Sequence, residues 1–428
     1  MQDPSGLPWY RKLHWQVLTA MLLGIVAGLI GGSELAGRIG WIGTLFMRLL
    51  RMIIVPLVLT SIVSGVASVG SGRALGRLFS KTMGYYMLSS ALAILAGLLV
   101  VNIIRPGVDA NMVDADSATL PNLEAPSSPV DVLLDIVPEN VIRAAAEPNM
   151  LGLIFFCILL GASIAALPDR PRELLTSIFG AFFQAMMRMT GGIIKFLPIG
   201  VFALITRVVG ETGFASFKAL GLYMLTIASG LTIHFLVTLP LLLFFLGRIR
   251  PGIHFGNMRG TLVVAFSTSS SGATLPMTMN AVENRVGVSN RVSSFVLPMG
   301  ATVNMDGTAL YECAGVMFIA QVLGVDLSLG QQLLVVLTAL LASIGAAAVP
   351  SAGLVIIFIV LEAVNLRGPE VDAIVASMLA IDRPLDMYRT VVNVFSDSCG
   401  AAIIAKSEGE EGIDDRVVEV VPPQASAG

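Results

Sequence analysis

Hydrophobic residues fill the first part of this chain in long runs, which are separated by short polar connections. Each run is about as long as the stretch of roughly 20 residues that an α-helix needs to cross the hydrocarbon core of a membrane. The runs lie near residues 16–32, 43–68, 82–104, 149–167, 174–207 and 214–247. This pattern predicts an all-α membrane protein with many spans.

The pattern changes from residue 258 onward. The segments 258–292 and 332–366 each have two short apolar arms with a break between them, STSSSG in the first and GAAAVPSAG in the second. Arms of this length are too short to cross, so each segment is predicted to be a re-entrant hairpin. A full-length apolar run follows each hairpin, at 294–322 and 373–405. A hairpin returns to its own side and the following helix crosses, so the two units are expected to form an inverted repeat.

Breaks of this kind restrict where the hairpins can lie. Unwound backbone in lipid leaves N–H and C=O groups without partners, so it persists only where it is buried in protein or lines a cavity. The N-termini of the half-helices then offer free N–H groups to an anion, and exposed carbonyl groups offer oxygens to a cation. Interrupted segments in corresponding halves of a chain are typical of a transporter binding site. The alternative for STSSSG alone is a serine-rich patch for helix packing.

Composition agrees with a protein of many spans. Hydrophobic residues make up 55% of the chain and charged residues 13%, whereas soluble domains carry about 25% charged residues. The net charge of −3 gives no reason to expect a nucleic-acid partner. The three cysteines, Cys157, Cys313 and Cys399, lie far apart in apolar runs and the three histidines are scattered. Neither a disulfide nor a metal cluster of these residues is therefore expected.

Basic residues fall on alternate connections between the predicted spans. They are Arg11 and Lys12, then Arg73, Arg77 and Lys81, then Arg170 and Arg172, then Arg248 and Arg250. The positive-inside rule makes these connections cytoplasmic, which places the acidic loop at 105–131 outside. Both termini are then expected to be cytoplasmic.

Four polar residues interrupt the last apolar run at helical spacing. Asp386, Arg389, Asn393 and Asp397 are separated by three, four and four residues, so they share one face of a helix. A charge near the bilayer centre costs from about 3 to more than 10 kcal/mol, so ionisable residues there face the protein interior and mark functional sites. A buried Asp–Arg pair that only fixes helix packing would not explain Asn393 and Asp397. We interpret this stripe as a ligand-binding site.

The span after the first hairpin carries a second polar cluster in TVNMDGTALYE. Asn304, Asp306 and Thr308 are polar groups at membrane depth, and Gly307 loosens the helix so that its carbonyl groups become accessible. Oxygens of amides, carboxylates and carbonyls are the ligands of a hard cation. Glu312 is expected near the outer end of this span, at the membrane interface.

Polar residues on other spans give weaker signals. YYMLSS places Tyr86, Ser89 and Ser90 at i, i+3 and i+4 on the third span, a face that alone is also typical of helix packing. Arg48 and Arg51, one turn apart, are expected to snorkel or pair structurally, without a role in transport.

Several of these motifs together resemble the glutamate transporter family, the dicarboxylate/amino acid:cation symporters, as found among archaeal and bacterial glutamate/aspartate transporters. The motifs are STSSSGATLP, NMDGT, AAAVPSAG and DMYRTVVNVFSD, joined by YYMLSS, MIIVPLVLTSIVSG and LLDIVPENV. They occur in order around two hairpins, and the resemblance covers about residues 10–408.

The resemblance implies eight transmembrane helices plus two oppositely oriented re-entrant hairpins, assembled as a homotrimer in the plasma (inner) membrane. A transport domain would slide past a fixed scaffold in an elevator mechanism. The scaffold would comprise residues 1–81 with the first two helices and 149–213 with the fourth and fifth, and 105–148 would form an extracellular loop and an interfacial helix. The transport domain would comprise the third helix, 82–104, and residues 214–408, which hold the sixth helix, hairpin 1 (258–292), the seventh helix (294–322), hairpin 2 (332–366) and the eighth helix (373–405). Residues 409–428 would be a disordered tail.

By position, the resemblance assigns the substrate's amino group to Asp386 and its side-chain carboxylate to Arg389. An Arg fork suits a planar carboxylate and an Asp suits an ammonium group, so together they select an acidic amino acid. The remaining substrate-binding residues implied are Ser270, Ser271, Thr308, Val349, Gly353, Thr390 and Asn393. Three sodium sites are also implied: Asp397 with Asn304 and Asn393; Tyr86, Ser89 and Ser90 with Asn304 and Asp306; and carbonyl groups around Thr302, Met305, Ser343 and Ile344.

The chain departs from the family pattern near the substrate. Family members carry an extra Arg either just before the hairpin serines or directly after the ammonium-binding Asp, where this chain has Ser269 and Met387. Arg383, one turn earlier, is a candidate substitute. Ser396 and Ala348 stand where the family usually has glycine, and the loss of Gly removes easy access to positive φ, which would slow gate opening.

The leading hypothesis is a sodium-coupled symporter for aspartate and glutamate. The alternative is a proton-coupled carrier for glutamate or C4-dicarboxylates, which Asp386 disfavours because it would lie unpaired without an ammonium group. The cation-site residues favour sodium over protons. No motif places a His or Lys to activate the STSSSG serines, so no enzyme activity is expected. A pure ion channel fits a side-chain-specific site less well than a carrier does.

Overall fold

The computed structural model describes residues 13–67, 73–108, 110, 137–146, 150–212, 215–343 and 352–415. Within these residues the regular secondary structure is helical, with no strand. The prediction of an all-α chain is confirmed for this part of the protein, and the number of membrane crossings stays a prediction.

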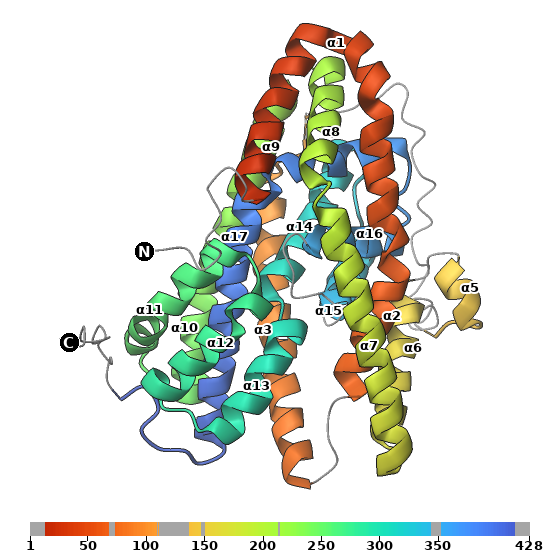
Figure 1. Ribbon diagram of the computed structural model, residues 1–428. Helices are drawn as coiled ribbons and strands as arrows, with labels where there is room; N and C mark the ends of the chain where they lie inside the picture. Colours follow the sequence, from red (N-terminus) through yellow and green to blue (C-terminus); the bar gives the residue numbers. More distant parts are fainter. Residues whose placement is uncertain are drawn as a thin grey trace, which may run out of the picture.

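One group of helices lies at the top and on the right of Figure 1. It contains α1 (Leu13–Met52), α2 (Ile54–Ala67), α5 (Val141–Ala146), α6 (Met150–Ala165), α7 (Asp169–Ile194) and α8 (Leu197–Thr212). α1 folds back at Gly32, whose φ of 55° and ψ of −153° suit glycine. α8 packs between the two arms of α1 (Figure 1), and the approach is close: a methyl group on Gly28 would lie 2.7 Å from Val209 Cβ. Glycine therefore fixes this helix pair by its lack of a side chain.

The second group of helices surrounds α14 and α17. It contains α3 (Arg73–Ile104), α9 (Ala215–Ile233), η2 (His234–Thr238), α10 (Leu239–Gly247), α11 (Pro251–Thr268), α12 (Ser271–Ala281), η3 (Val282–Val286), α13 (Asn290–Val303), α14 (Asp306–Val322), α15 (Leu329–Ser343), α16 (Ala352–Ala363) and α17 (Pro369–Ser407). Every side chain of α14 from Asp306 to Ala320 is buried, and α17 packs against α9, α10, α11, α13 and α14. The two helices that carry most of the predicted site thus lie in the interior.

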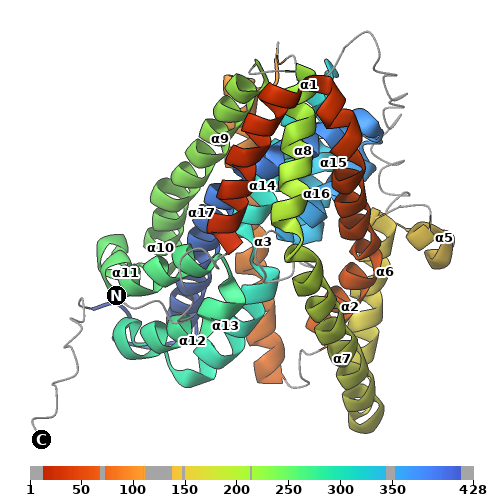
Figure 2. The same cartoon turned by 45° about the horizontal axis from the view of Figure 1, so that its top comes forward.

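Both interrupted segments form pairs of short helices. α11 ends at Thr268, and the next residue, Ser269, has a left-handed φ of 50°. Ser270 caps α12 by accepting from the Ala273 N–H at 3.2 Å. α15 and α16 form the second pair, and the tip between them, with Ile344, Ala348 and Val349, lies outside the described residues. Figure 2 places α11 and α12 toward the lower end of α17, while α15 and α16 lie higher, beside α14. The breaks at STSSSG and GAAAVPSAG thus separate two helices each, as the pattern predicted.

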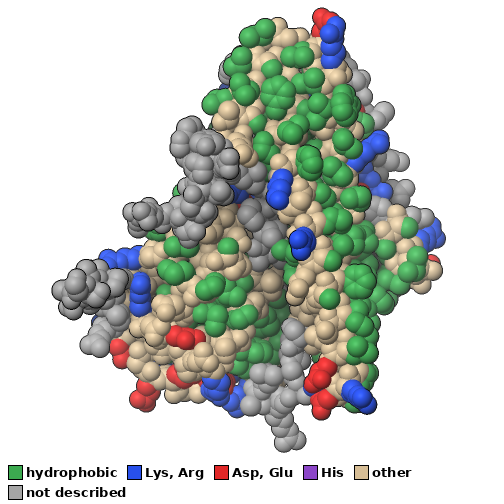
Figure 3. Space-filling model, viewed as in Figure 1, with side chains coloured by type: hydrophobic (Ala, Val, Ile, Leu, Met, Phe, Trp, Pro, Cys, Tyr) green, Lys and Arg blue, Asp and Glu red, His purple; other side chains and the backbone are tan. Residues whose placement is uncertain are grey.

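Helices long and apolar enough to cross a membrane are present in both groups. Three meet this description in the described residues: Trp15–Leu49, Gly76–Ile104 and Lys218–Gly247. A fourth candidate is the pair Asp169–Ile193 and Leu197–Arg207, which is bent by 52°. Figure 3 shows an apolar band over α1, α7 and α8, with the acidic side chains in this view mostly at the upper tip and toward the lower edge. These features are those of an integral membrane protein.

The region 105–148, in which an interfacial helix was expected, contains the short helix α5. α5 begins at Val141, where Asn140 Oδ1 accepts from the N–H groups of Ile142 at 2.9 Å and Arg143 at 3.1 Å. An Asn in this position supplies partners for N–H groups that a first turn leaves free. Residues 109, 111–136 and 147–148 of this region lie outside the described residues.

The segment after α17 is packed against the protein as far as residue 415, so the expectation of a disordered tail from 409 is wrong for residues 409–415. Glu408 is 3% exposed and accepts from Arg77 Nη2 at 2.7 Å and from Lys81 Nζ at 2.6 Å, both on α3. Ile413 is buried, and Asp414 accepts from Asn257 Nδ2 at 2.8 Å. The acidic residues of this segment thus contact polar side chains on α3 and α11. Residues 416–428 lie outside the described residues.

A second polar contact holds the same segment. His254 on α11 is buried, with Nδ1 2.5 Å from Asp414 Oδ2 and Nε2 2.9 Å from Ser398 Oγ. The order Ser–His–Asp resembles that of a hydrolase triad. All three side chains are at most 4% exposed, however, and the Ser398 hydroxyl bonds the Phe395 carbonyl at 2.7 Å. We interpret this cluster as a structural tie between α11, α17 and the C-terminal segment.

Replacing Glu408 with Gln tests the tie to α3. Hydrogen bonds from Arg77 and Lys81 hold the pKa of Glu408 at about 2, below its ordinary 4.5. A lowered carboxylate pKa contributes stability above about pH 5, and this contribution is lost as the pH falls toward 2. We expect Glu408→Gln to lower the Tm of the detergent-solubilised protein by about 2 °C at pH 7, and by less at pH 3. Glu34→Gln, which removes an exposed pair with Arg38, is the control. An equal loss of Tm at both pH values would contradict this account.

Candidate functional site

The stripe on α17 is enclosed on all sides. Asp386, Arg389, Asn393 and Asp397 are between 1% and 5% exposed. The backbone of α14 lies directly against them: the Gly307 N–H donates to Asn393 Oδ1 at 2.7 Å, and a methyl group on Gly307 would lie 3.0 Å from the Arg389 carbonyl oxygen. The prediction that the four residues share one buried face is confirmed, and Gly307 allows α14 to reach that face.

Arg389 is held by acidic and aromatic partners. Its Nη2 donates to Asp386 Oδ1 at 2.8 Å, and its Nη1 lies 3.2 Å from Asp382 Oδ1. The guanidinium also stacks on the Tyr311 ring, 4.0 Å from the ring centre. A cation in such a position is stabilised by opposite charge and by the ring face. Asp382 and Tyr311 were not singled out from the sequence, although Asp382 is an acidic residue one turn before Asp386.

Arg383 also reaches this cluster. Its Nη1 lies 3.3 Å from Asp386 Oδ2, and its side chain is 7% exposed. Asp386 therefore has a guanidinium on each carboxylate oxygen. The structure thus places Arg383 within reach of the residue to which the family resemblance assigned the substrate's amino group.

Two further predicted substrate residues contact the stripe, Gly353 at Arg389 and Thr308 at Asn393. Asn393 Nδ2 donates to Thr308 Oγ1 at 3.4 Å and approaches Met305 Sδ at 3.3 Å. Gly353, near the start of α16, brings the second hairpin to the same place, because a methyl group there would lie 3.1 Å from Arg389 Nη1. Thr390 is buried but donates to the Asp386 carbonyl at 2.9 Å, so its hydroxyl is engaged within α17.

The serines of the first hairpin lie at the N-terminus of α12, which packs against α17. Ser271 is 5% exposed, and Ser270 supplies the cap of α12. The N–H groups of a first helical turn favour an anion. Val349, the other predicted hairpin-tip residue, lies outside the described residues.

Oxygen-bearing residues gather where α13 gives way to α14. The helix breaks at Asn304 and Met305, which have φ/ψ of −94°/80° and −109°/54°. Asn304 Nδ2 donates to Asp397 Oδ1 and to Ser396 Oγ, both at 2.9 Å. Asn304 Oδ1 is buried and has no hydrogen-bond partner among the described residues. Such an oxygen lacks a donor or a cation, which makes the break the best-supported cation position.

The second predicted cation set is also assembled. Asp306 is fully buried and accepts from Ser90 Oγ at 2.6 Å and from Ser89 Oγ at 2.5 Å. Tyr86 lies beside the same break: a methyl group on Gly300 would lie 2.5 Å from both Tyr86 OH and Asp397 Oδ1. The weak signal of YYMLSS is thus supported by contact with α14.

The third predicted set is not joined by its side chains. Thr302 Oγ1 donates to the Met299 carbonyl at 3.1 Å, and Ser343 Oγ donates to the Leu340 carbonyl at 2.8 Å. Each hydroxyl therefore bonds its own helix. Ile344 lies outside the described residues.

His234 is a site residue that sequence reasoning missed. It begins the π-helical segment η2, is buried, and places Nε2 3.0 Å from Asp306 Oδ2. A histidine within an apolar span is itself an intramembrane ionisable group, and that signal could have singled it out. No group of three or more His, Cys, Asp or Glu residues in the described part of the chain could hold a metal ion.

Glu312 also lies in the interior, so its expected position at the membrane interface is wrong. It is fully buried, and neither carboxyl oxygen has a hydrogen-bond partner among the described residues. The reason is that other helices cover α14 along nearly its whole length. Glu312 lies four residues after Thr308, on the same face of the helix.

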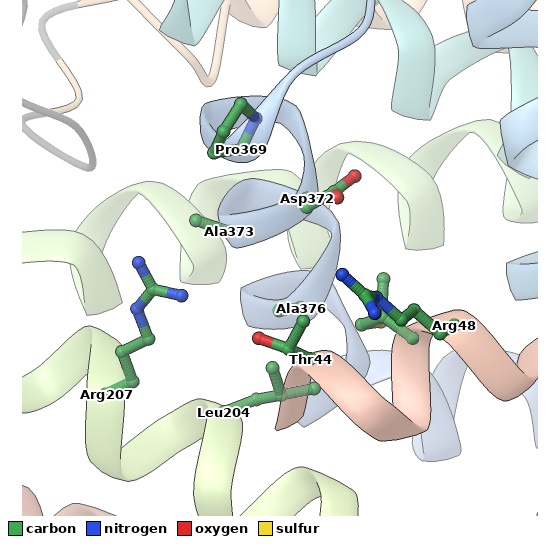
Figure 4. Close-up of a pocket in the computed structure, with 9 residues that line it drawn as sticks. Thr44, Arg48, Leu204, Arg207, Pro369, Asp372, Ala373 and Ala376 are labelled. Atoms are coloured by element: carbon green, nitrogen blue, oxygen red, sulfur yellow. The ribbon is translucent and has the colours of Figure 1, made fainter. Parts of the chain in front are cut away.

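A cavity of about 270 Å³ lies away from the stripe, between the two helix groups. Figure 4 shows Arg207 on α8 and Arg48 on α1 on opposite sides of the first turns of α17, which carry Asp372. Its remaining lining residues are Thr44, Met47, Leu204, Pro369, Ala373 and Ala376. Arg48 thus faces the boundary between the helix groups.

Comparison with known proteins agrees with this arrangement. The model of the sodium:dicarboxylate symporter family matches residues 13–407. Excitatory amino acid transporter 3 of Mus musculus is 35% identical over 468 residues, covering 95% of this chain and 88% of that protein. An excitatory amino acid transporter of Caenorhabditis elegans is 36% identical (92% and 88% covered), and a proton/sodium-glutamate symport protein of Bacillus caldotenax is 34% identical (93% and 95% covered). This chain therefore belongs to the sodium:dicarboxylate symporter family.

Proposed function

We propose that this protein is a secondary active symporter that takes up aspartate and glutamate together with sodium ions. The observation that carries the proposal is the order of groups along one face of α17. Asp386 and Arg389 present opposite charges, and Asn393 and Asp397 follow beside the helix break at Asn304. An acidic amino acid carries an ammonium group and two carboxylates, which this arrangement matches.

Arg389 would bind the side-chain carboxylate, because a guanidinium donates two parallel hydrogen bonds to a planar anion. Asp386 would bind the ammonium group. Thr308 and Asn393, which already contact each other across α14 and α17, would bind the remaining carboxylate together with the hairpin residues Ser270, Ser271, Val349, Gly353 and the neighbouring Thr390. The buried setting supports specificity for the side-chain carboxylate, because a substrate without that carboxylate would bring no anion to the buried Arg389 guanidinium.

Sodium is a cargo of the proposed carrier. The carboxylate, amide and hydroxyl oxygens of Asp306, Asp397, Asn304 and Ser90 suit a hard cation. The buried Asn304 Oδ1 without a partner among the described residues supports this position. Tyr86, Ser89 and Asn393 would complete the first two cation positions, and carbonyl groups near Thr302, Met305, Ser343 and Ile344 a third.

The division into two helix groups supports an elevator mechanism. α1, α2, α6, α7 and α8 would form the fixed scaffold, and the helices around α14 and α17 would move past it with the bound cargo. The cavity with Arg48 and Arg207 lies on this boundary. A homotrimer in the plasma membrane with both termini cytoplasmic completes the proposal.

Uptake into proteoliposomes tests the coupling. We expect labelled aspartate to accumulate when sodium is higher outside than inside, and to stop accumulating when potassium or choline replaces the external sodium. The gradient is the only energy source in this preparation. Equal uptake with and without the gradient would contradict sodium coupling, and stronger competition by succinate than by glutamate would contradict the substrate assignment.

Substitutions at the two charged residues test the site. Loss of one partner of a buried charge pair costs about 2–5 kcal/mol, so we expect Arg389→Ala to weaken sodium-dependent aspartate binding about 100-fold or more. Neutral amino acids, which do not use this guanidinium, should still bind. Asp386→Ala should lose acidic and neutral amino acids alike, because both carry the ammonium group. Isothermal titration of the purified variants measures these affinities, and normal aspartate binding by both would rule out the site.

The environment of Glu312 favours a second candidate function, in which the protein transports a proton together with sodium and the substrate. A fully buried carboxyl group without a donor among the described residues is a poor place for a permanent negative charge. It lies one turn from Thr308, so a proton carried there would travel with the substrate. This candidate adds an ion to the proposed symport and leaves the substrate unchanged.

Glu312→Gln separates the two candidates, since it keeps the shape of the side chain and removes the proton site. In proteoliposomes with a sodium gradient, we expect an added inward proton gradient to stimulate uptake by the wild type and to leave the variant unchanged. Glu283→Gln, at the η3 end of the protein, is the control and should behave as the wild type does. A full pH response in Glu312→Gln would exclude this carboxyl group as the proton carrier.

A further inference from the structure

Four charged residues alternate in sign on the buried side of α17. Asp382 contacts Arg389 at 3.2 Å, Arg389 contacts Asp386 at 2.8 Å, and Asp386 contacts Arg383 at 3.3 Å. All four side chains are at most 7% exposed. The set contains two guanidiniums and two carboxylates, so its charges balance. Arg383 is the last residue in this chain of ion pairs, and it contacts Asp386.

The contact with Arg383 changes what Asp386 requires from a ligand. A buried carboxylate that lost its sole partner would strongly oppose binding. Asp386 has two guanidinium partners, one on each oxygen. When Arg389 turns to the carboxylate of a substrate, Arg383 still neutralises Asp386. An ammonium group on the substrate would take the Oδ1 atom that Arg389 leaves, and for a substrate without one Asp386 still keeps Arg383 on Oδ2.

We propose that Arg383 is a specificity-determining residue, a built-in counter-ion of Asp386 that sets how far the site distinguishes an acidic amino acid from the same diacid without an amino group. This inference rests on the proposed function, because it assumes that Asp386 and Arg389 bind the substrate. With Arg383 in place, the diacid leaves no unpaired charge, and the amino acid gains less from its ammonium group than it would without Arg383. Without Arg383, only the amino acid supplies a cation to Asp386.

The test compares aspartate with succinate, which has the same carboxylates and no amino group. Isothermal titration in sodium gives the ratio of the Kd for succinate to the Kd for aspartate. We expect Arg383→Gln to raise this ratio at least tenfold, through weaker succinate binding and unchanged or tighter aspartate binding. Arg383→Lys, which keeps the charge, should lie between the wild type and Arg383→Gln. It also provides the measurement if the Gln variant does not fold. Arg367→Gln, at a half-exposed arginine that pairs with Glu362, is the matched control and should leave the ratio unchanged.

Repeating the Arg383→Gln substitution in the Asp386→Asn variant separates an electrostatic role of Arg383 from a role in packing. In Asp386→Asn there is no carboxylate to leave unpaired, so adding Arg383→Gln should change succinate affinity by less than about threefold. A purely structural role of Arg383 would weaken succinate binding equally in both backgrounds.

A ratio that rises less than tenfold in Arg383→Gln, or equally in both backgrounds, overturns the inference and leaves the proposed function standing if the wild type binds aspartate. A wild type that binds neither compound in sodium overturns the proposed function and this inference with it.

Discussion

The buried guanidinium of Arg389 is the constraint on which the rest of the structure depends. A cation within an apolar helix is tolerated only if opposite charges and polarisable groups surround it. Asp382 and Asp386 supply the charges, and the aromatic ring of Tyr311 stacks on the guanidinium of Arg389. These partners lie on α17 itself and on α14, so α17 must lie inside the protein with α14 against it. The helices outside this pair present the apolar surface instead.

Close approach of α14 to α17 has a consequence for the cation positions. Gly307 leaves room for the Arg389 backbone, and Gly300 leaves room for Asp397 and Tyr86. Between these two glycines the helix breaks, and the side chain of Asn304 turns to Asp397 and Ser396. The backbone geometry that admits the charged face of α17 thus also frees the oxygens that suit a cation. Substrate residues and cation residues are neighbours because both depend on the same contact.

Patterns within one element were predictable from the sequence, and contacts between elements were not. The spacing from Asp386 to Asp397 and the apolar arms around STSSSG report periodicity along one helix, so the stripe and the hairpins could be found. The contact of His234 with Asp306 joins residues 72 positions apart, and no local pattern encodes it. The sequence predicts an interfacial Glu312 from its position toward the outer end of an apolar span, whereas burial along the whole of α14 depends on which helices surround it. Likewise, Asp414 looks like a solvated residue until His254 and Asn257 are seen beside it.

The contacts between the stripe and the break suggest how ion and substrate binding are linked in the proposed symporter. Asn393 bonds the Gly307 N–H and Thr308, which begin α14, while Asn304 at the break bonds Asp397 on the same face of α17. A cation that orders Asn304 and Asp397 therefore also fixes the start of α14, where Thr308 lies. A substrate that holds Asn393 and Thr308 fixes the same backbone from the other side. Linkage requires that each then raises the affinity of the other by the same factor. Coupling of this kind needs no long-range signal, because the two sites lie on adjacent turns of α17 and beside one break in its neighbour.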